Sequence, residues 1–294
     1  MYVITAPTST IGRLVVDDLL DRGEKPRLVT RDASRLAPGV RERAEIVEGS
    51  HGDEAVIDRA CADAEAVFWL APDDGDAPST EAAYVNFTRP AAQAFARHGV
   101  RRVVAVTALG RGTPLAEHAG AVTSSRAMCD LIAASGVNFR AVACPSFMHN
   151  LLNHVRSIRE QGLFFMMADP DLKAPTVAAR DIAATAVSLL LDGTWTRSGE
   201  VACLGPEDLS PNDMARIVSE VLGTEVGYRQ IGGAAFKERM TGFGMTEGMA
   251  QGLVDMFEAK NRGLDNAEPR TAGSTTPTTF RQWCEEVLKP AMTG

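Results

Sequence analysis

The chain opens with Met1-Tyr2-Val3-Ile4-Thr5-Ala6-Pro7-Thr8-Ser9-Thr10-Ile11-Gly12, and this stretch decides the fold. A short apolar run, Tyr2 to Thr5, leads through a tight turn into an amphipathic stretch, Ile11 to Leu20. The pattern predicts strand, turn and helix, the first unit of a nucleotide-binding α/β domain. Such a turn normally carries three glycines, but the three places hold Ala6, Ser9 and Gly12. The layout therefore predicts a dinucleotide fold, and the substitutions raise the question of whether a dinucleotide still binds.

The first half of the chain alternates between β-rich runs and helical patterns. We expect strands at residues 2–5, 26–30, 44–47, 66–70, 101–107 and 138–143, and helices near 11–22, 32–36, 53–61, 80–98 and 123–135. This alternation predicts parallel strands joined by right-handed crossovers. The run from Ala66 to Leu70 is apolar throughout, which is typical of a strand covered on both faces. The expected fold class is α/β, with a Rossmann-like, doubly wound parallel sheet.

The pattern changes after Pro145. An apolar helix is expected from Arg180 to Leu191, a strand over 201–204, and a helix from Pro211 that ends at Gly223. Residues 233–262 look helical and Met-rich, and a final helix is expected over 279–288. These short elements could not bury a core alone. We therefore divide the chain into a nucleotide-binding domain, residues 1–150, with later segments packing back on it, and a smaller mixed α/β substrate-binding cap, residues 151–294.

Composition narrows the function classes. The net charge is −8 and the longest basic cluster is Arg101-Arg102, so we expect no nucleic-acid partner. No apolar run approaches the ~18 residues of a membrane span. The predicted strand at residue 2 leaves no room for a signal peptide, which favours a cytoplasmic protein. The five cysteines are scattered singly, which predicts reduced thiols and no disulfide or metal site. Monomer and homodimer both stay open.

The opening turn is the first candidate binding site. Backbone N–H groups and the positive dipole end of a helix N-terminus attract a pyrophosphate. Gly12 keeps the place where helix and strand pack closely, whereas Pro7 removes one N–H. A plain strand–turn–helix without a ligand is the alternative. We expect the nucleotide to lie across Pro7, Thr8, Ser9, Thr10, Ile11 and Gly12.

Further along, Arg31 directly follows the second predicted strand. An acid at this place suits the ribose 2′-hydroxyl, whereas an arginine suits a 2′-phosphate. Because Asp32 follows Arg31, the signal is mixed, and we favour NADP while NAD stays open. Ligands of open α/β sheets bind at the carboxyl ends of strands. The segments expected there, beside the cofactor ribose and nicotinamide, are Leu70-Ala71-Pro72 and Thr107-Ala108.

Several segments together resemble the NmrA-like family of atypical short-chain dehydrogenases/reductases. Beside the opening unit they are Val29–Asp32, Val47–Gly49, Gly99–Val104, Ser135–Val137, Pro145–Asn150, Arg180–Ala183 and Leu204–Ser210. The resemblance implies that the first domain binds NAD(P) and that Pro145, Ser146 and Phe147 lie beside the nicotinamide. Members of this family include quinone and azo reductases, enzymes that reduce natural-product intermediates, and redox-sensing regulators without turnover.

The chain departs from the usual proton donor of short-chain dehydrogenases, a Tyr-x-x-x-Lys pair. It has three tyrosines, Tyr2, Tyr84 and Tyr228, and none has lysine four residues later. Where that helix is expected lies Arg126, which could anchor a cofactor or substrate but does not give up its proton near neutrality. A proton would then come from solvent or from a histidine, His149 or His118. The candidate catalytic residues are therefore His149, His118 and Arg126.

Three functions compete. The first is an NAD(P)H-dependent oxidoreductase that reduces a small apolar carbonyl, enone or quinone-like compound in a pocket lined by methionines such as Met240 and Met256. The second is an NADP-sensing regulatory protein without turnover, which the missing Tyr/Lys pair favours. The third is a cofactor-independent isomerase or cyclase that kept the fold, which Ala6, Pro7 and Ser9 favour.

Overall fold

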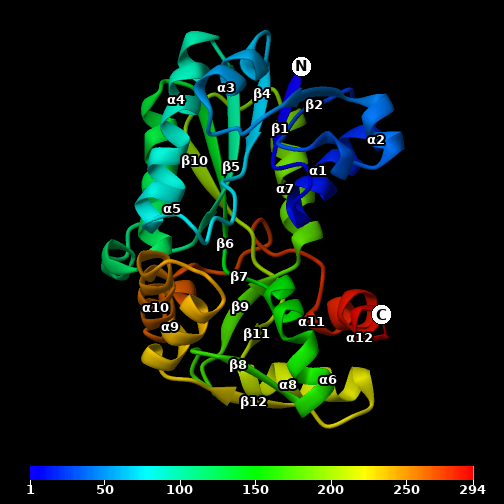
Figure 1. The fold of residues 1–294 in the computed structure, drawn as a ribbon, viewed down its shortest axis with the longest axis vertical. Helices are drawn as coiled ribbons and strands as arrows, with labels where there is room; N and C mark the ends of the chain where they lie inside the picture. Colours follow the sequence, from blue (N-terminus) through cyan, green and yellow to red (C-terminus); the bar gives the residue numbers. More distant parts are fainter. Residues whose placement is uncertain (294) are drawn as a thin grey trace.

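Seven parallel strands form the central sheet of the computed structural model, which describes residues 1–293 (Figure 1). Their order across the sheet is β10-β6-β5-β4-β1-β2-β3. The strands are β1 (Tyr2–Thr5), β2 (Arg27–Thr30), β3 (Glu45–Glu48), β4 (Ala66–Trp69), β5 (Arg102–Ala108), β6 (Asn138–Cys144) and β10 (Gly199–Ala202). The order reverses direction at β1, which pairs with β2 on one side and β4 on the other. The predicted α/β, doubly wound fold class is confirmed.

Helices cover both faces of this sheet because the strands are apolar on both faces. Ile4 packs with α1 (Thr10–Asp21) and α7 (Ala179–Leu191) on one face, while Val3 packs on the other. The helices of that second face are α3 (Glu54–Cys61), α4 (Phe87–Arg97) and α5 (Ala121–Ala134). β4 is buried at every position, as its unbroken apolarity predicted. The shorter elements of this half are η1 (Ala33–Arg35), α2 (Pro38–Arg43), the π-helical η2 (Ala82–Asn86) and η3 (Pro114–His118).

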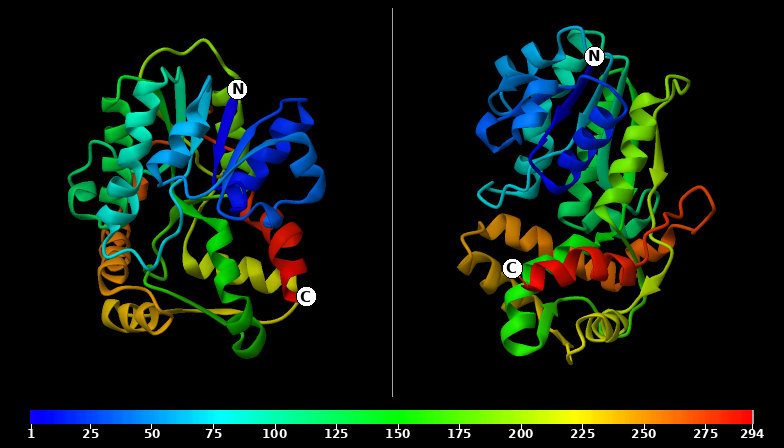
Figure 2. Two further views of the ribbon diagram at one scale, coloured as in Figure 1. Left: turned by 45° about the horizontal axis from the view of Figure 1, so that its top comes forward. Right: turned by 90° about the vertical axis from the view of Figure 1, so that its right-hand side faces the viewer.

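A second lobe, the cap lobe, follows the carboxyl end of β6. It holds a three-stranded sheet of β7 (Ser146–Phe147), β9 (Ala174–Val177) and β11 (Asp208–Leu209), and the pair β8 (Leu163–Met166) and β12 (Gly227–Gln230). Its helices are η4 (Met148–His154), α6 (Val155–Gln161), α8 (Pro211–Leu222), α9 (Gly233–Gly242), α10 (Glu247–Asn261), η5 (Leu264–Ala267), α11 (Phe280–Trp283), η6 (Cys284–Leu288) and α12 (Lys289–Thr293). Figure 2 shows the N-terminus on the sheet lobe and the C-terminus on the cap lobe.

Two segments after residue 150 return to the sheet lobe. Helix α7 packs on α1, and β10 extends the sheet by pairing with β6, with Val201 opposite Val142. The strand expected over 201–204 is thus β10, two residues earlier. The division of the chain at residue 150 stays a prediction, since α7 and β10 cross it.

The helical region expected over residues 233–262 consists of two helices, α9 and α10. Between them Thr246 is the N-cap of α10: its Oγ1 accepts from the Met249 N–H at 3.3 Å and donates to the Ala77 carbonyl at 2.5 Å. This pair of hydrogen bonds ties the start of α10 to the loop after β4. The sequence analysis did not divide this region, although Thr246 is a residue type that favours an N-cap.

Candidate active site

The turn after β1 is closed by Ser9. The Ala6 carbonyl accepts from the Ser9 N–H at 3.0 Å and from the Ser9 hydroxyl at 2.8 Å. The same hydroxyl caps α1, because it accepts from the Gly12 N–H at 3.0 Å. The Ser9 side chain is therefore held within the turn. The first amides of a helix have no intrahelical acceptor, and the dipole makes this end positive, so the turn offers an anion site.

Gly12 is required at its place by close packing. A Cβ on Gly12 would lie 2.1 Å from the Ala6 carbonyl oxygen and 2.9 Å from the Ser9 hydroxyl. Any side chain would therefore push α1 away from the turn. This close approach of helix to strand is the purpose that the third glycine of such turns serves.

A cavity of about 380 Å³ lies beside this turn. Its lining includes the turn residues, the segment after β2, and the loop after β4. Asp32 caps η1, since its Oδ1 accepts from the Ser34 N–H at 2.9 Å and from the Ser34 hydroxyl at 2.6 Å, which lowers the pKa of Asp32. Arg31 and Arg35 line this cavity, together with the carboxylates of Asp32, Asp73 and Asp74.

His51 also lines this first cavity and was missed by the sequence analysis. Its ring lies edge-on to Trp69 and Phe87, with centroids 5.1 Å and 4.8 Å away, and its Nε2 is 3.1 Å from the Leu70 carbonyl oxygen. Burial lowers the pKa of His51 to about 4. The ring is therefore neutral at physiological pH and belongs to an aromatic wall. A single histidine after a strand carries no pattern that would reveal this position.

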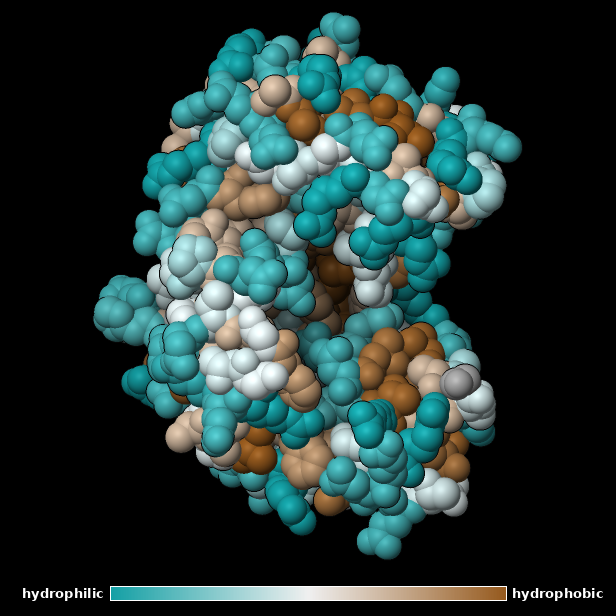
Figure 3. All heavy atoms as spheres, viewed as in Figure 1, coloured by the Kyte–Doolittle hydropathy of each residue, from teal (hydrophilic) through white to brown (hydrophobic). Residues whose placement is uncertain are grey.

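A second cavity, of about 570 Å³, lies between the carboxyl end of β6 and the cap lobe. Ser146 and Phe147 line it, together with apolar side chains of α9 and α10 such as Met240 and Met256. Asp73 lines both cavities, so the two adjoin. Figure 3 shows the molecule hollowed between its two lobes, with apolar residues at the bottom of the hollow.

The residues expected to bind the cofactor divide into three groups. Pro7, Thr8, Ser9, Arg31 and Pro72 line the first cavity, and Ser146 and Phe147 line the second. The others do not line these two cavities; they are Thr10, Ile11, Gly12, Leu70, Ala71, Thr107, Ala108 and Pro145. Their contact with a cofactor stays a prediction.

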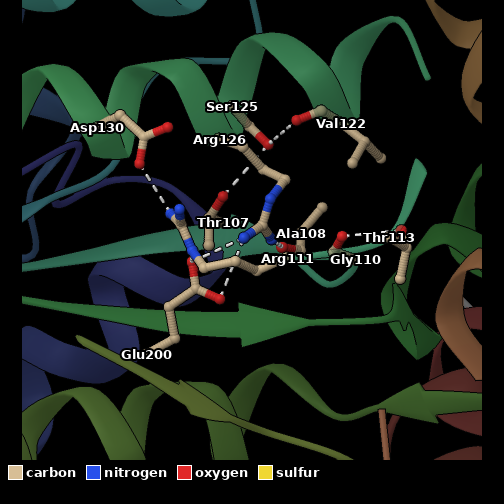
Figure 4. A network of polar contacts seen from close by, with 10 residues as sticks. All are labelled: Thr107, Ala108, Gly110, Arg111, Thr113, Val122, Ser125, Arg126, Asp130 and Glu200. Carbon is tan, nitrogen blue, oxygen red and sulfur yellow. Dashed lines mark hydrogen bonds and ion pairs between the residues drawn. The ribbon is translucent and has the colours of Figure 1, made fainter. Parts of the chain in front are cut away.

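The Arg126 side chain is hydrogen-bonded to other residues of the protein (Figure 4). It is buried on α5, and its guanidinium donates to the Ala108 carbonyl at 2.7 Å and to the Glu200 carboxylate at 2.9 Å. Arg111 donates to the same carboxylate at 2.5 Å and to Asp130 at 2.9 Å. This network joins α5 and the end of β5 to β10. Arg126 lines neither cavity, and its catalytic role stays a prediction.

The two candidate histidines also lie outside both cavities. His118 is exposed on η3. His149 accepts at Nδ1 from the Trp283 indole N–H at 3.2 Å, and burial lowers its pKa. The histidine that lines the second cavity is His154, whose pKa burial lowers to about 4. Proton donation by His149 or His118 stays a prediction.

The described residues, 1–293, hold no cluster of three or more His, Cys, Asp or Glu side chains that could bind a metal ion. Nor do any of their helices have the length and apolarity needed to cross a membrane. All five cysteines are buried and free.

The fold is Rossmann-type, with two adjoining cavities, one beside the turn after β1 and one between the carboxyl end of β6 and the cap lobe. The NAD(P)H-binding family matches residues 8–193, more than half of the chain. The protein belongs to this family. This match confirms the family resemblance and the NAD(P) cofactor that were expected from the sequence.

Its relatives include several reductases. The chain is 31% identical to (4-alkanoyl-5-oxo-2,5-dihydrofuran-3-yl)methyl phosphate reductase of Streptomyces griseus, over 97% of both chains. It is 28% identical to NAD(P)H azoreductase of Xenophilus azovorans, over 87% of this chain and 86% of that one. Among solved structures, the NADPH complex of the quinone oxidoreductase QOR2 of Escherichia coli is similar with a TM-score of 0.80, 17% identity, and coverage of 98% of this chain and 100% of that one. At that identity the likeness concerns the fold.

Proposed function

We propose that this protein is an NADPH-dependent reductase that transfers hydride to a small, largely apolar carbonyl, enone or quinone-like compound. The observation that carries the proposal is the pair of adjoining cavities. One begins at a helix N-terminus with Arg31 and Arg35 in its wall, and the other is apolar and contains Ser146 and Phe147. A dinucleotide spanning both would place its nicotinamide where the acceptor compound binds.

The residues of the turn fit a dinucleotide. The close approach at Gly12, which a Cβ would block, lets the start of α1 come near a pyrophosphate, and the helix dipole favours its negative charge. Arg31 and Arg35 favour a 2′-phosphate, and hence NADP, because charge-assisted hydrogen bonds to phosphate are strong. When bound, NADPH supplies the hydride. The protein binds both compounds, orients them, and excludes water with Phe147 and the methionines of α9 and α10.

The relatives support this type of acceptor. The name of the Streptomyces relative describes an oxo-dihydrofuran, whose ring alkene is conjugated to carbonyl groups, and the Xenophilus relative is named as an azoreductase. Both kinds of acceptor contain a conjugated π system that can accept hydride. The apolar second cavity is suited to hold a compound of this kind.

The test is titration with NADPH and NADH, followed by a scan of NADPH oxidation against quinones and enones. Arg31→Ala should narrow the preference for NADPH by roughly ten- to a hundredfold, since a charge-assisted bond contributes about 1.5–3 kcal/mol. Arg41→Ala is the matched control, because Arg41 is exposed on α2 and does not line the cavity.

Each competing function gives a different result. NADPH binding without oxidation by any acceptor contradicts the reductase and supports a sensor. Absence of binding supports the cofactor-independent enzyme. If the ratio of the dissociation constants for NADPH and NADH is the same in Arg31→Ala as in the parent, Arg31 does not contact the 2′-phosphate.

A further inference from the structure

The apolar second cavity contains one buried ion pair, between Lys260 and Asp265. Lys260 lies in the last turn of α10 and Asp265 in η5. The Lys260 ammonium donates to Asp265 Oδ2, and the two side chains are only 13% and 3% exposed. Both residues line the cavity together with Ser146 and Phe147. The pair therefore adds a buried charged group to the lining of this cavity.

Packing places this pair beside the carboxyl end of β5. Leu264, next to Asp265, packs with Ala108, the last residue of β5. It also lies against Gly110, where a Cβ would be 2.7 Å from Leu264 Cδ1. In open α/β sheets this edge is where the reacting end of a ligand lies.

The chemistry of the pair suggests a ligand. Taking two charges out of water is costly, and an apolar pair of similar volume is often at least as stable. Asp265 Oδ1 is buried and has no hydrogen-bond partner among residues 1–293. A lysine anchored by one carboxylate oxygen has further N–H donors, because an ammonium carries three. Such a group, in the lining of a largely apolar cavity, suits an oxygen atom that becomes negatively charged.

We propose that Lys260, held by Asp265, binds the oxygen of the substrate's carbonyl or quinone group and supplies the proton that completes its reduction. This inference rests on the proposed reductase function and names the catalytic residue of that site. Lys260 is the catalytic residue because its Nζ touches the substrate oxygen, and Asp265 is a positioning residue.

The electrons and protons of this step balance. With a ketone or enone, the acceptor carbon gains hydride from NADPH, which is oxidised to NADP⁺, and the π electron pair moves to the oxygen, which takes a proton from Lys260 Nζ to give an alcohol or an enol that returns to the ketone. With a quinone, one carbonyl oxygen gains the hydride, the electron pair moves through the ring to the other oxygen, and that oxygen takes the proton from Lys260 Nζ to give the hydroquinone. The neutral Lys260 amine then regains a proton from solvent.

Three other residues in or near the cavity are less suited to donate this proton. Burial keeps His154 neutral, because its pKa is lowered to about 4. His149 lies outside the cavity beside Trp283. Arg239 lines the cavity, but it is exposed and lies over Phe165 and Phe243. Among the cavity's cations, Lys260 is the buried one with a carboxylate partner.

The first experiment compares Lys260→Met, Lys260→Arg and the parent with the best acceptor found in the scan. Lys260→Met should lower kcat by ~100-fold or more, the contribution of a positioned general acid, while NADPH affinity stays unchanged. Lys260→Arg should have a KM for the acceptor close to the parent's, because it keeps the positive charge. Its kcat should stay low, because arginine does not release a proton. Lys237→Met is the matched control: it breaks the surface pair with Glu247 on the same cap lobe, outside the cavity.

Lys260→Met alone leaves the buried Asp265 carboxylate unpaired and could unfold the protein. The double variant Lys260→Met/Asp265→Asn controls for this, since it removes both charges together. It should melt near the parent's temperature and show the same low kcat. Full kcat in any folded variant that lacks Lys260 overturns the proposal. His149→Ala, assayed alongside, should keep its kcat; a loss of kcat confined to His149→Ala would make His149 the donor instead.

The second experiment needs no turnover. p-Nitrophenol is titrated against pH in the presence of protein and NADP⁺, and its phenolate absorbance is recorded. Beside Lys260 the bound phenol should ionise at a lower pH than free phenol, and Lys260→Met should abolish this shift. Absence of a shift in the parent overturns the proposal. A shift in a parent that reduces no acceptor would overturn the reductase function and the proton transfer, and would support Lys260 as an oxyanion site alone.

Discussion

At the scale of single residues, Ala6 has an unusual backbone conformation. Its φ is +48°, in the left-handed region that costs an ordinary L-residue about 1–2 kcal/mol. The two hydrogen bonds from Ser9 to its carbonyl hold it there. The first glycine of the usual motif is thus absent, but the conformation it serves is kept. Ala6 therefore strains the turn without abolishing it.

Ala6→Gly should relieve this strain. Because glycine also adds entropy to the unfolded chain, by about 0.4–1 kcal/mol, we expect a net gain of about 0.5 kcal/mol in the free energy of unfolding, measured with urea. NADPH should bind more tightly, since the backbone can approach the pyrophosphate more closely. Asp63→Gly is the control: Asp63 has φ +57° in a loop away from both cavities, so it should leave NADPH affinity unchanged. A destabilised Ala6→Gly protein would show that Ala6 is not strained.

At the scale of elements, the Arg126–Glu200 pair fastens β10 to α5 and β5 (Figure 4). Glu200→Ala leaves the buried Arg126 guanidinium with the Ala108 carbonyl as its remaining partner in this network. We expect a loss of about 3 kcal/mol in the free energy of unfolding, in line with broken buried pairs. The readout is thermal and urea denaturation, with kcat per folded molecule measured in parallel.

Asp130→Ala tests the exposed end of the same network. Its partner Arg111 is about half exposed, so the free energy of unfolding should fall by less than about 1 kcal/mol. If Arg126→Met loses kcat but keeps its stability, Arg126 acts on substrate or cofactor, as the sequence analysis predicted. If it loses stability and keeps kcat, its role is to fasten β10.

At the scale of the whole molecule, buried histidines couple folding to pH. The pKa of His51 is about 4 in the folded protein and 6.5 when unperturbed. The unfolded state therefore takes up the proton first as pH falls, so stability falls below about pH 6.5 and the effect levels off below about pH 4. At about pH 5 the loss should be roughly 2 kcal/mol relative to neutrality. His154 and His149, whose pKa values are also lowered, act in the same direction.

The measurement is urea unfolding between neutral pH and about pH 5, for the parent and for His51→Gln. Glutamine keeps a donor for the Leu70 carbonyl but does not titrate. We expect a shallower pH dependence in the variant. The same slope in both proteins would mean that His51 is not buried as a neutral ring.

The sheet lobe could be predicted from sequence because its signals are local. Each strand and its following helix show an apolar period within about ten residues, and β1 and β4 were located to within one residue. The Gly12 packing and the Arg31 position follow from the same short unit. The cap lobe was predicted less well, because its strands β8, β9, β11 and β12 do not follow the regular strand–helix alternation that marks the sheet lobe.

The sequence by itself determined the Rossmann-like fold, the strand–turn–helix unit that opens it and the family, because hydrophobic periodicity and turn chemistry act between neighbouring residues. Only the tertiary structure decided that β10 completes the sheet, that Asp32 is occupied as a cap, and that Arg126 is held by Glu200. It alone brings Lys260 and Asp265 into one cavity with Phe147, more than a hundred residues earlier. These contacts depend on how two lobes pack across the carboxyl edge of the sheet, and no local pattern encodes that packing.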